Sequence, residues 1–263
     1  MDFPISAQIA RNLEFLPETG STNADLVAKA PNTDDFSVLV AGYQTAGKGR
    51  AGREWLAPAG SSLFVSILLK PAGIDPANYS FLPLLAGLAM TRCVSEFLPN
   101  SKVSLKWPND VLVGENKIAG VLSELLPTQD GVVIGAGLNI KQQQSELPIS
   151  SATSIALAGG KELNLDLILA SYLADFKSLY RSWLEHGANS DTSGVLAQVV
   201  ASCSTIGRES NLVRVILPGD KEFTGEAIGI DSSGRLLVSR DEDSAAEKVV
   251  AVAAGDVIHL RHN

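Results

Sequence analysis

Short apolar runs, separated by proline, glycine and polar turns, restrict the folds open to this chain of 263 residues. The segments 36–44 and 61–71 are apolar and rich in Val and Leu, which is typical of buried strands. Residues 102–126 contain three strand-like pieces, broken at Pro108 and at a polar Gly-Glu-Asn-Lys turn. A further strand is predicted at 131–140, with glycines where a ligand or another backbone can approach closely.

Three segments have the pattern of helices. Hydroxyl side chains at 21–22 suit an N-cap, and the helix that follows is expected to end at Pro31. Residues 79–98 form an apolar helix between prolines. Residues 165–187 have the clearest helical periodicity, with large apolar side chains three or four positions apart: Ile168, Tyr172, Phe176, Leu179 and Trp183.

The character of the chain changes after residue 205. From 206 onward, short β-runs alternate with Pro-Gly, Asp-Ser-Ser-Gly and Gly-Asp turns, a pattern that predicts a small all-β module. We therefore expect an α+β fold in two parts. Residues 1–205 would form a mixed β-sheet flanked by helices, and residues 206–263 would form the β module.

Composition excludes several classes of function. The balance of 21 basic against 29 acidic residues gives a net charge of −8, which argues against general nucleic-acid or membrane-surface binding. Cys93 and Cys203 are too few for a disulfide framework and fit a reducing cytosol, while the three histidines offer no zinc cluster. The chain does not start like a signal peptide, and its apolar stretch 81–90 is shorter than the ~20 residues that span a bilayer. We expect a soluble, cytoplasmic protein.

This acidic chain contains one glycine-rich basic segment, GYQTAGKGRAGREW at 42–55. It matches both G-x-x-x-x-G-K and G-x-G-x-x-G, but neither phosphate signature has its context, because no Ser or Thr follows Lys48 and no helix begins there. The remaining interpretation is a loop that folds over an anionic ligand, in which Lys48, Arg50 and Arg53 supply charge and Trp55 an apolar wall. A solvated loop whose charges meet no ligand is the alternative.

Three further segments place polar groups beside apolar strands. KWPND at 106–110 arranges a lysine, an asparagine and an aspartate around a proline, which suits either a site or an ordinary turn. Lys117 precedes an apolar run and is either an edge residue or a cation held in a cleft. Asn139 ends a strand, where its amide either binds a base or ribose or caps a turn. No single segment decides between these alternatives.

The motifs taken together do decide. In order and spacing they closely resemble the motifs of biotin protein ligases, from about residue 14 to the C-terminus: S-T-N at 21–23, Q-T-A-G-K-G-R-x-G-R-x-W at 44–55, K-W-P-N-D at 106–110, K-I-A-G-V-L-x-E at 117–124 and G-A-G-L-N-I at 135–140. The resemblance implies a biotin- and ATP-binding catalytic domain over 1–205 and an SH3-like β-barrel over 206–263. Some relatives carry an N-terminal helix-turn-helix, for which S-T-N at residue 21 leaves no room, so the chain resembles the ligase-only type.

The same resemblance implies two half-reactions. The carboxylate of biotin attacks the α-phosphate of MgATP, which gives biotinyl-5′-AMP and pyrophosphate. A lysine of a biotin carboxyl carrier domain, from acetyl-CoA carboxylase or a related carboxylase, then attacks the acyl carbon and releases AMP. ATP and Mg²⁺ are the implied cofactors, with biotin as substrate, no nucleic acid or membrane as partner, and a monomer or homodimer as the assembly. Lipoate–protein ligase is the rival enzyme, and a non-catalytic sensor of the adenylate is the alternative from another class.

The site residues follow from the matching motifs. Lys117 is expected to be the central catalytic residue, with Arg50 beside it and Asp110 to orient or deprotonate the incoming amine. The implied biotin-binding set is Ser21, Thr22, Asn23, Gln44, Lys48, Gly49, Arg50, Lys117 and Gly120. The implied ATP- and adenylate-binding set is Arg50, Arg53, Trp55, Lys106, Asn109, Lys117 and Asn139, with Trp55 over the adenine and no protein-held metal, since Mg²⁺ arrives with ATP.

Two details of the loop 42–55 add to this prediction. The family commonly has Arg at the position of Lys48, and lysine keeps the charge but loses the planar bidentate fork. A glycine-rich loop that orders over an acyl-adenylate would exclude water from it. We therefore expect the loop to be poorly ordered without ligand.

Overall fold

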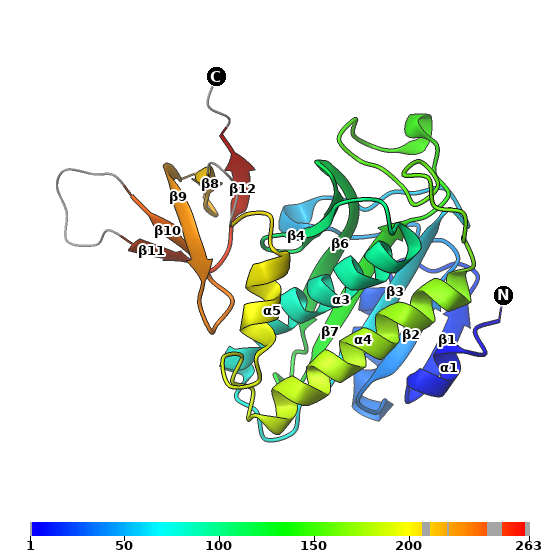
Figure 1. The fold of residues 1–263 in the computed structure, drawn as a ribbon. Coiled ribbons are helices and arrows are strands. Elements are labelled where there is room, and N and C mark those ends of the chain that lie inside the picture. Colours follow the sequence, from blue (N-terminus) through cyan, green and yellow to red (C-terminus); the bar gives the residue numbers. More distant parts are fainter. Residues whose placement is uncertain (1, 207–210, 220, 241–248, 261–263) are drawn as a thin grey trace.

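The computed structural model describes residues 2–206, 211–219, 221–240 and 249–260. Over these ranges the chain forms a seven-stranded mixed sheet with helices and a separate five-stranded antiparallel sheet (Figure 1). The expected α+β fold is confirmed. No helix in the described ranges has the length and apolarity needed to cross a membrane.

The main sheet has the strand order β1-β2-β3-β7-β6-β5-β4, and its neighbours pair antiparallel except for β1 and β2. All residues of β2, β3 and β7 are buried, which is why their sequences are apolar without alternation. The strands are β1 Asn12–Leu16, β2 Ser37–Ala41, β3 Ser62–Leu69, β4 Val103–Lys106, β5 Asp110–Val113, β6 Asn116–Leu125 and β7 Val132–Asn139.

Helices cover the two faces of the main sheet unequally. Two long helices, α3 and α4, lie side by side over one face, where the large core forms (Figure 1). The short helix α2 covers part of the opposite face, where Leu26 packs against Leu39, Leu68 and Val133. The rest of that opposite face is left for a site. The helices are α1 Ser6–Ile9, α2 Thr22–Lys29, α3 Leu82–Phe97, α4 Leu165–Glu185 and α5 Val195–Ser202.

The predicted helices and strands of the main domain are confirmed, and three elements were not predicted. The strand β1 has only five residues and lies at the sheet edge, with an exposed and half-buried pattern that gives little signal. The helix α5 has the sequence VLAQVVAS, whose β-branched residues do not favour a helix. The helix α1 has only four residues. In each case tertiary contacts outweigh local preference.

The second sheet has the order β11-β10-β9-β8-β12 and is wholly antiparallel. It is attached to the main sheet through the turn 231–234. Three consecutive carbonyls of this turn accept hydrogen bonds: from Ser190 Oγ to Ser232 (2.7 Å), from Ser80 Oγ to Ser233 (2.9 Å) and from Trp107 Nε1 to Gly234 (2.9 Å). The strands are β8 Leu212–Ile216, β9 Glu222–Ile230, β10 Leu236–Ser239, β11 Val249–Val252 and β12 Asp256–His259.

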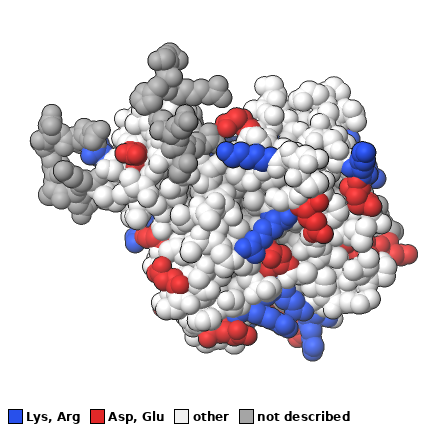
Figure 2. Space-filling view, in the orientation of Figure 1, with Lys and Arg blue, Asp and Glu red and all other residues white. Residues whose placement is uncertain are grey.

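Charged side chains are mixed over the surface. On the face drawn in Figure 2, Lys and Arg are interspersed with Asp and Glu and do not gather into one broad basic area. This agrees with the acidic composition of the chain.

A buried carboxylate fastens the start of the chain to α4. Asp166 accepts hydrogen bonds from the backbone N–H of Ile5 (3.0 Å) and Ser6 (2.9 Å) and from the hydroxyl of Ser6 (2.7 Å). Burial raises the pKa of Asp166, but these hydrogen bonds outweigh burial, and the net pKa lies below its usual range. The ionised carboxylate is therefore the form that stabilises the fold.

We predict that Asp166→Ala lowers the free energy of unfolding by about 1–3 kcal/mol, because buried donors lose their acceptor. Asp175 lies on the same helix in a more exposed pair with Arg92, so Asp175→Ala is the matched control and should cost about 1 kcal/mol or less. Urea unfolding followed by circular dichroism measures both. Equal effects of the two substitutions would contradict the anchoring role.

The same contact predicts a pH dependence. A carboxyl whose folded pKa is depressed stabilises the fold above its unfolded pKa of about 3.9 and loses this contribution as the pH falls through the folded pKa. The stability difference between wild type and Asp166→Ala should therefore be full above pH ~5 and shrink below pH ~4. Unfolding midpoints at a series of pH values check this, and a difference that grows on acidification would contradict it.

Candidate active site

A cavity of about 640 Å³ lies on the face of the main sheet that α3 and α4 leave open. The loop 42–55, the segment 106–110, the residues after β7 and the start of β12 surround it. Every residue that the sequence assigned to the site lines this cavity. The structure therefore brings together segments that are far apart in the sequence.

The floor of the cavity is bare sheet. Gly120 on β6 and Gly137 on β7 are opposite each other in the strand register, and the indole of Trp55 lies against both. A Cβ atom on Gly137 would lie 2.6 Å from Trp55 Cε2, and one on Gly120 would lie 3.1 Å from Trp55 Cζ3. The glycines expected to admit a close approach do so, and the approaching group is Trp55. Its Nε1 is buried and has no hydrogen-bond partner among the described residues. Its contact with adenine stays a prediction.

One end of the cavity is closed by a network of polar side chains. Gln44 Oε1 accepts hydrogen bonds from the backbone N–H (2.8 Å) and the hydroxyl (2.9 Å) of Thr22. Ser66 Oγ lies 2.7 Å from Thr22 Oγ1 and 2.6 Å from Asn23 Oδ1, and Asn23 donates to the Leu122 carbonyl (3.4 Å). All of these polar side chains are buried. Because Thr22 occupies the oxygen of Gln44, the amide nitrogen of Gln44 is the group left for a ligand.

The two neighbouring hydroxyls have different partners, and their contact with biotin stays a prediction. Ser21 caps α2 by accepting from the backbone N–H of Ala24 at 3.5 Å, whereas Thr22 joins the network of the cavity. Ser66 was missed by the sequence analysis. The available signal was a single hydroxyl in the middle of SLFVSILL, a strand that is otherwise apolar after its first residue.

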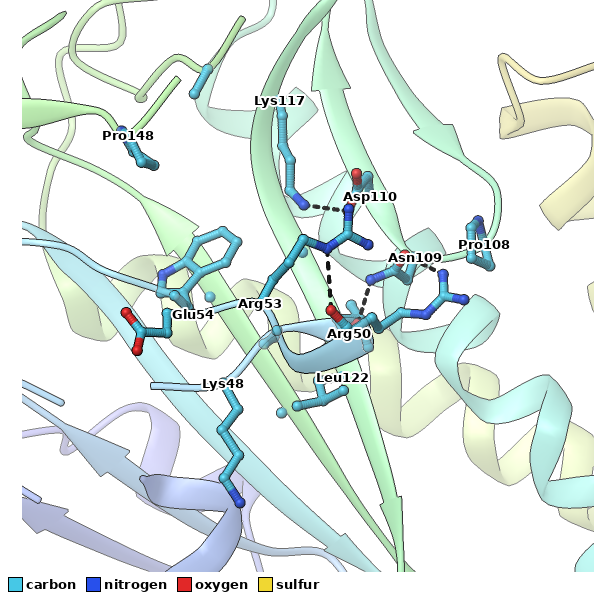
Figure 3. Close-up of a pocket in the computed structure, with 18 of the residues that line it drawn as sticks. Lys48, Arg50, Arg53, Glu54, Pro108, Asn109, Asp110, Lys117, Leu122 and Pro148 are labelled. Atoms are coloured by element: carbon cyan, nitrogen blue, oxygen red, sulfur yellow. Dashed lines mark hydrogen bonds and ion pairs between the residues drawn. The ribbon is translucent and has the colours of Figure 1, made fainter. Parts of the chain in front are cut away.

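Cations gather at the other end of the cavity (Figure 3). Lys117 Nζ lies 2.6 Å from Asp110 Oδ1 and 5.6 Å from the centre of the Trp55 ring. Arg50 donates to Asn109 Oδ1 (3.0 Å), and Asn109 in turn donates to the Val121 carbonyl (2.7 Å). Lys117 is thus held by a carboxylate at the edge of β5 rather than extended into solvent.

Arg50 is partly buried, which affects the pKa of its guanidinium. Desolvation lowers the pKa of the Arg50 guanidinium and is the largest effect. The negative charges of Asp256 and Asp110 raise this pKa, and the positive charge of Arg53 lowers it. The net result is a lowered pKa. An arginine starts so far above neutral pH that the side chain remains a cation. A partly desolvated cation interacts more strongly with an anion than an exposed one does.

Two further lysines, Lys48 and Lys106, line the cavity. Lys106 ends β4 opposite Asp110 in the strand register and lines the cavity. Lys48 points away from Lys117 and Arg50, and its Nζ lies 4.0 Å from Glu124 Oε1 (Figure 3). The geometry therefore separates Lys48 from the other cations of the loop. Its predicted biotin contact stays a prediction.

Asn139 is buried and engaged on both sides of its amide. Its nitrogen donates to the Thr153 carbonyl (3.0 Å), and its oxygen accepts from Gln142 Nε2 (2.9 Å). Gln142 also accepts from the backbone N–H of Ile140 (2.9 Å) and was not predicted. Asn139 fixes the segment that follows β7 over the cavity, and its contact with a nucleotide stays a prediction.

Backbone hydrogen bonds within the loop 42–55 shape its second half. The backbone N–H of Gly49 donates to the Arg53 carbonyl (2.7 Å), and that of Trp55 donates to the Gly47 carbonyl (2.9 Å). These bonds fold the loop back on itself above the cavity. The expectation that it is poorly ordered without ligand stays a prediction.

The arrangement suits a reaction between anions. Five cationic side chains line the cavity, namely Lys48, Arg50, Arg53, Lys106 and Lys117. The described residues contain no cluster of His, Cys, Asp or Glu that would hold a metal ion. Positioned cations stabilise developing negative charge without reorganising during the reaction.

Comparisons with known proteins agree with this geometry. The Biotin/lipoate A/B protein ligase family matches residues 14–139, and the Biotin protein ligase C terminal domain matches residues 205–260. The chain is 37% identical over 255 residues to a biotin--[acetyl-CoA-carboxylase] ligase of Mycobacterium tuberculosis. The matched segment covers 95% of this chain and 90% of the relative. It is 30% identical over 234 residues to the bifunctional ligase/repressor BirA of Escherichia coli, covering 88% of this chain and 70% of that one.

A solved structure has the same fold. The biotin protein ligase from Aquifex aeolicus in complex with biotin and ATP matches with a TM-score of 0.77 and 28% identity, over 94% of this chain and 98% of the other. The match to the mycobacterial ligase covers 95% of this chain and therefore includes both sheets. This chain belongs to the biotin protein ligase family.

Proposed function

We propose that this protein activates biotin with ATP to biotinyl-5′-AMP and transfers the biotinyl group to a lysine of a biotin carboxyl carrier domain. The observation that carries the proposal is one cavity with a polar closed end and a cationic end. The closed end suits the ureido ring of biotin, which needs paired donors and acceptors in an apolar setting. The cationic end suits a carboxylate and a triphosphate. The names of the relatives and the biotin and ATP complex support this assignment.

The first step brings two anions together. A carboxylate oxygen of biotin attacks the α-phosphorus of ATP, and pyrophosphate leaves. Lys117 lies between the bare sheet and Asp110, so its ammonium group can contact both the carboxylate and the α-phosphate. Lys106 and Arg53 also line the cavity, where their charges can contact the phosphates. This neutralisation is the main contribution of the protein to the step.

Mg²⁺ fits this cavity as an ion carried by ATP. The described carboxylates of the lining are Glu54, Asp110 and Asp256, and the last two are already paired with Lys117 and Arg53. Phosphate oxygens rather than a protein cage would hold the ion, as is usual for Mg²⁺ in nucleotide sites. When bound, it supplies further neutralisation of the phosphates.

The second step needs a neutral amine. The carrier lysine attacks the acyl carbon, AMP leaves, and the amine loses a proton. The pKa of a free lysine is about 10.4, so the amine is mostly protonated at neutral pH. A group of the enzyme must therefore orient or deprotonate it. We assign this role to Asp110, and its support is that the carboxylate pairs with Lys117 and lines the cavity.

Three further assignments accompany this function. Residues 1–205 form the catalytic domain and residues 206–263 the C-terminal domain. The partner is the biotin carrier domain of acetyl-CoA carboxylase or a related carboxylase. Because Cys93 and Cys203 are buried free thiols, a reducing compartment such as the cytoplasm suits the protein.

The direct test is transfer. The protein is incubated with biotin, MgATP and an unmodified carrier domain, and intact-mass spectrometry follows the carrier. One biotinyl group on the carrier's target lysine, absent when ATP is omitted, is the expected result. Calorimetric titration with biotin and with lipoate separates the lipoate ligase alternative, since the polar closed end should bind only biotin tightly. A protein that binds the adenylate but never forms it would be a sensor.

Lys117→Ala should abolish formation of biotinyl-5′-AMP while leaving the fold intact. The Lys117 side chain is 30% exposed and Asp110 25%, so the unpaired carboxylate can be hydrated. Chromatography of the reaction products measures the adenylate, and Lys161→Ala, an exposed lysine outside the cavity, is the control. Activity within about threefold of wild type would show that Lys117 has no catalytic role.

Arg50→Gly should leave adenylate synthesis in place and speed escape of the adenylate. Lys117 and Lys106 still serve the first step, but a charge-assisted contact to phosphate worth about 1.5–3 kcal/mol is lost, so release should be roughly ten- to hundredfold faster. Free adenylate acylates any amine, and serum albumin added to the reaction should become biotinylated. If adenylate forms but is held as long as in wild type and albumin stays unlabelled, Arg50 is not the retaining group.

A further inference from the structure

The two arginines of the loop 42–55 contact the second sheet. Arg53 Nη2 donates to Asp256 Oδ1 at 3.0 Å, and Arg50 Nη2 donates to the Gly255 carbonyl at 3.3 Å. Asp256 is the first residue of β12 and lies 203 positions from Arg53 in the sequence. The loop over the cavity is thus bounded on one side by the sheet floor and on the other by the edge of the C-terminal domain.

The second sheet is a fixed support for these contacts. Asp256 pairs with Ile216 across β12 and β8, so its backbone is held in the sheet. The turn 231–234 of the same sheet is held to the main domain by hydrogen bonds from Trp107, Ser80 and Ser190. Gly255 and Asp256 therefore have a defined position relative to the cavity.

The loop itself needs such a support. Gly47, Gly49 and Gly52 allow many backbone conformations, and Gly52 has a positive φ of 73°. The pair of Arg53 (59% exposed) and Asp256 (47% exposed) is too hydrated to add much to folding stability. An ion pair of this kind is better suited to selecting one conformation of a flexible loop than to stabilising the fold.

We propose that Asp256 is a positioning residue of the active site: by pairing with Arg53, beside the Gly255 carbonyl that holds Arg50, it keeps the loop closed over the cavity. This inference rests on the proposed function. The C-terminal domain would then help to retain the activated intermediate through its contacts with the loop. Asp256 acts through Arg53 and is not a catalytic residue.

The test is the rate at which biotinyl-5′-AMP leaves the enzyme. Asp256→Asn should release it about two- to fivefold faster, the range expected for an exposed pair, and should label added serum albumin more than wild type does. Asp256→Glu should restore retention. Asp256→Arg should release faster than Asp256→Asn, because it places a cation beside Arg53.

A matched control separates positioning from general damage to the sheet. Glu222 pairs with Arg214 in the same sheet at 3.9 Å and does not line the cavity, so Glu222→Gln should leave release unchanged. Thermal midpoints of all variants should agree within a few degrees. If Asp256→Asn retains the adenylate as long as wild type, or if Glu222→Gln releases it equally fast, the proposal is overturned.

A second measurement does not depend on biotin chemistry. Hydrogen exchange of the amides at 47–55 in the ligand-free protein should be faster in Asp256→Asn than in wild type, because the loop loses its contact with β12. Unchanged exchange there would overturn the positioning role even if the enzyme proved to be a ligase. Wild-type protein that makes no adenylate would instead refute the proposed function, while the exchange result would still report on the loop.

Discussion

The packing of Trp55 against Gly120 and Gly137 is the contact on which the site depends. The two glycines leave the sheet without side chains at the point where β6 and β7 pair, and the indole fills that space. Because Trp55 closes the basic loop, its position also sets where the loop crosses the cavity. Any side chain at Gly137 would meet the indole, so this face of the sheet admits either the loop or a bulky residue, but not both.

Electrostatics explains why the loop is basic in an acidic chain. The reactants of an adenylating ligase are a carboxylate and a triphosphate, and their repulsion is the principal barrier to bringing them together. Three cations from different segments line the cavity and can offset this repulsion: Lys117, Arg50 and Lys106. Asp110 pairs with Lys117 in the cavity, and the proposed role of its carboxylate is to act on the incoming amine.

Much of the fold could be predicted from the sequence, because buried strands and the long helix α4 have strong periodic or apolar patterns. The cavity lining followed from the motifs, since Thr22, Gln44 and Lys117 all face it. Contacts between residues far apart in the chain could not be predicted from the sequence. Ser66 is one hydroxyl in an apolar strand, and nothing local indicates that it meets Thr22 and Asn23.

The role of Trp107 illustrates the same limit. Trp107 is buried, and its Nε1 donates to the Gly234 carbonyl in the turn 231–234 of the second sheet, a contact that the KWPND motif does not indicate. The contact of Asp256 with Arg53 likewise spans 203 residues. Such contacts depend on how the two sheets pack against each other. The local sequence around each residue does not contain this information.

The central claim is that the cavity joins biotin to ATP. Exchange of labelled pyrophosphate into ATP by the wild-type protein tests it most directly, since exchange requires reversible formation of an acyl-adenylate. The account predicts exchange that depends on biotin and does not occur with lipoate or without either acid. Exchange that is absent with biotin, or that lipoate supports equally well, would contradict it.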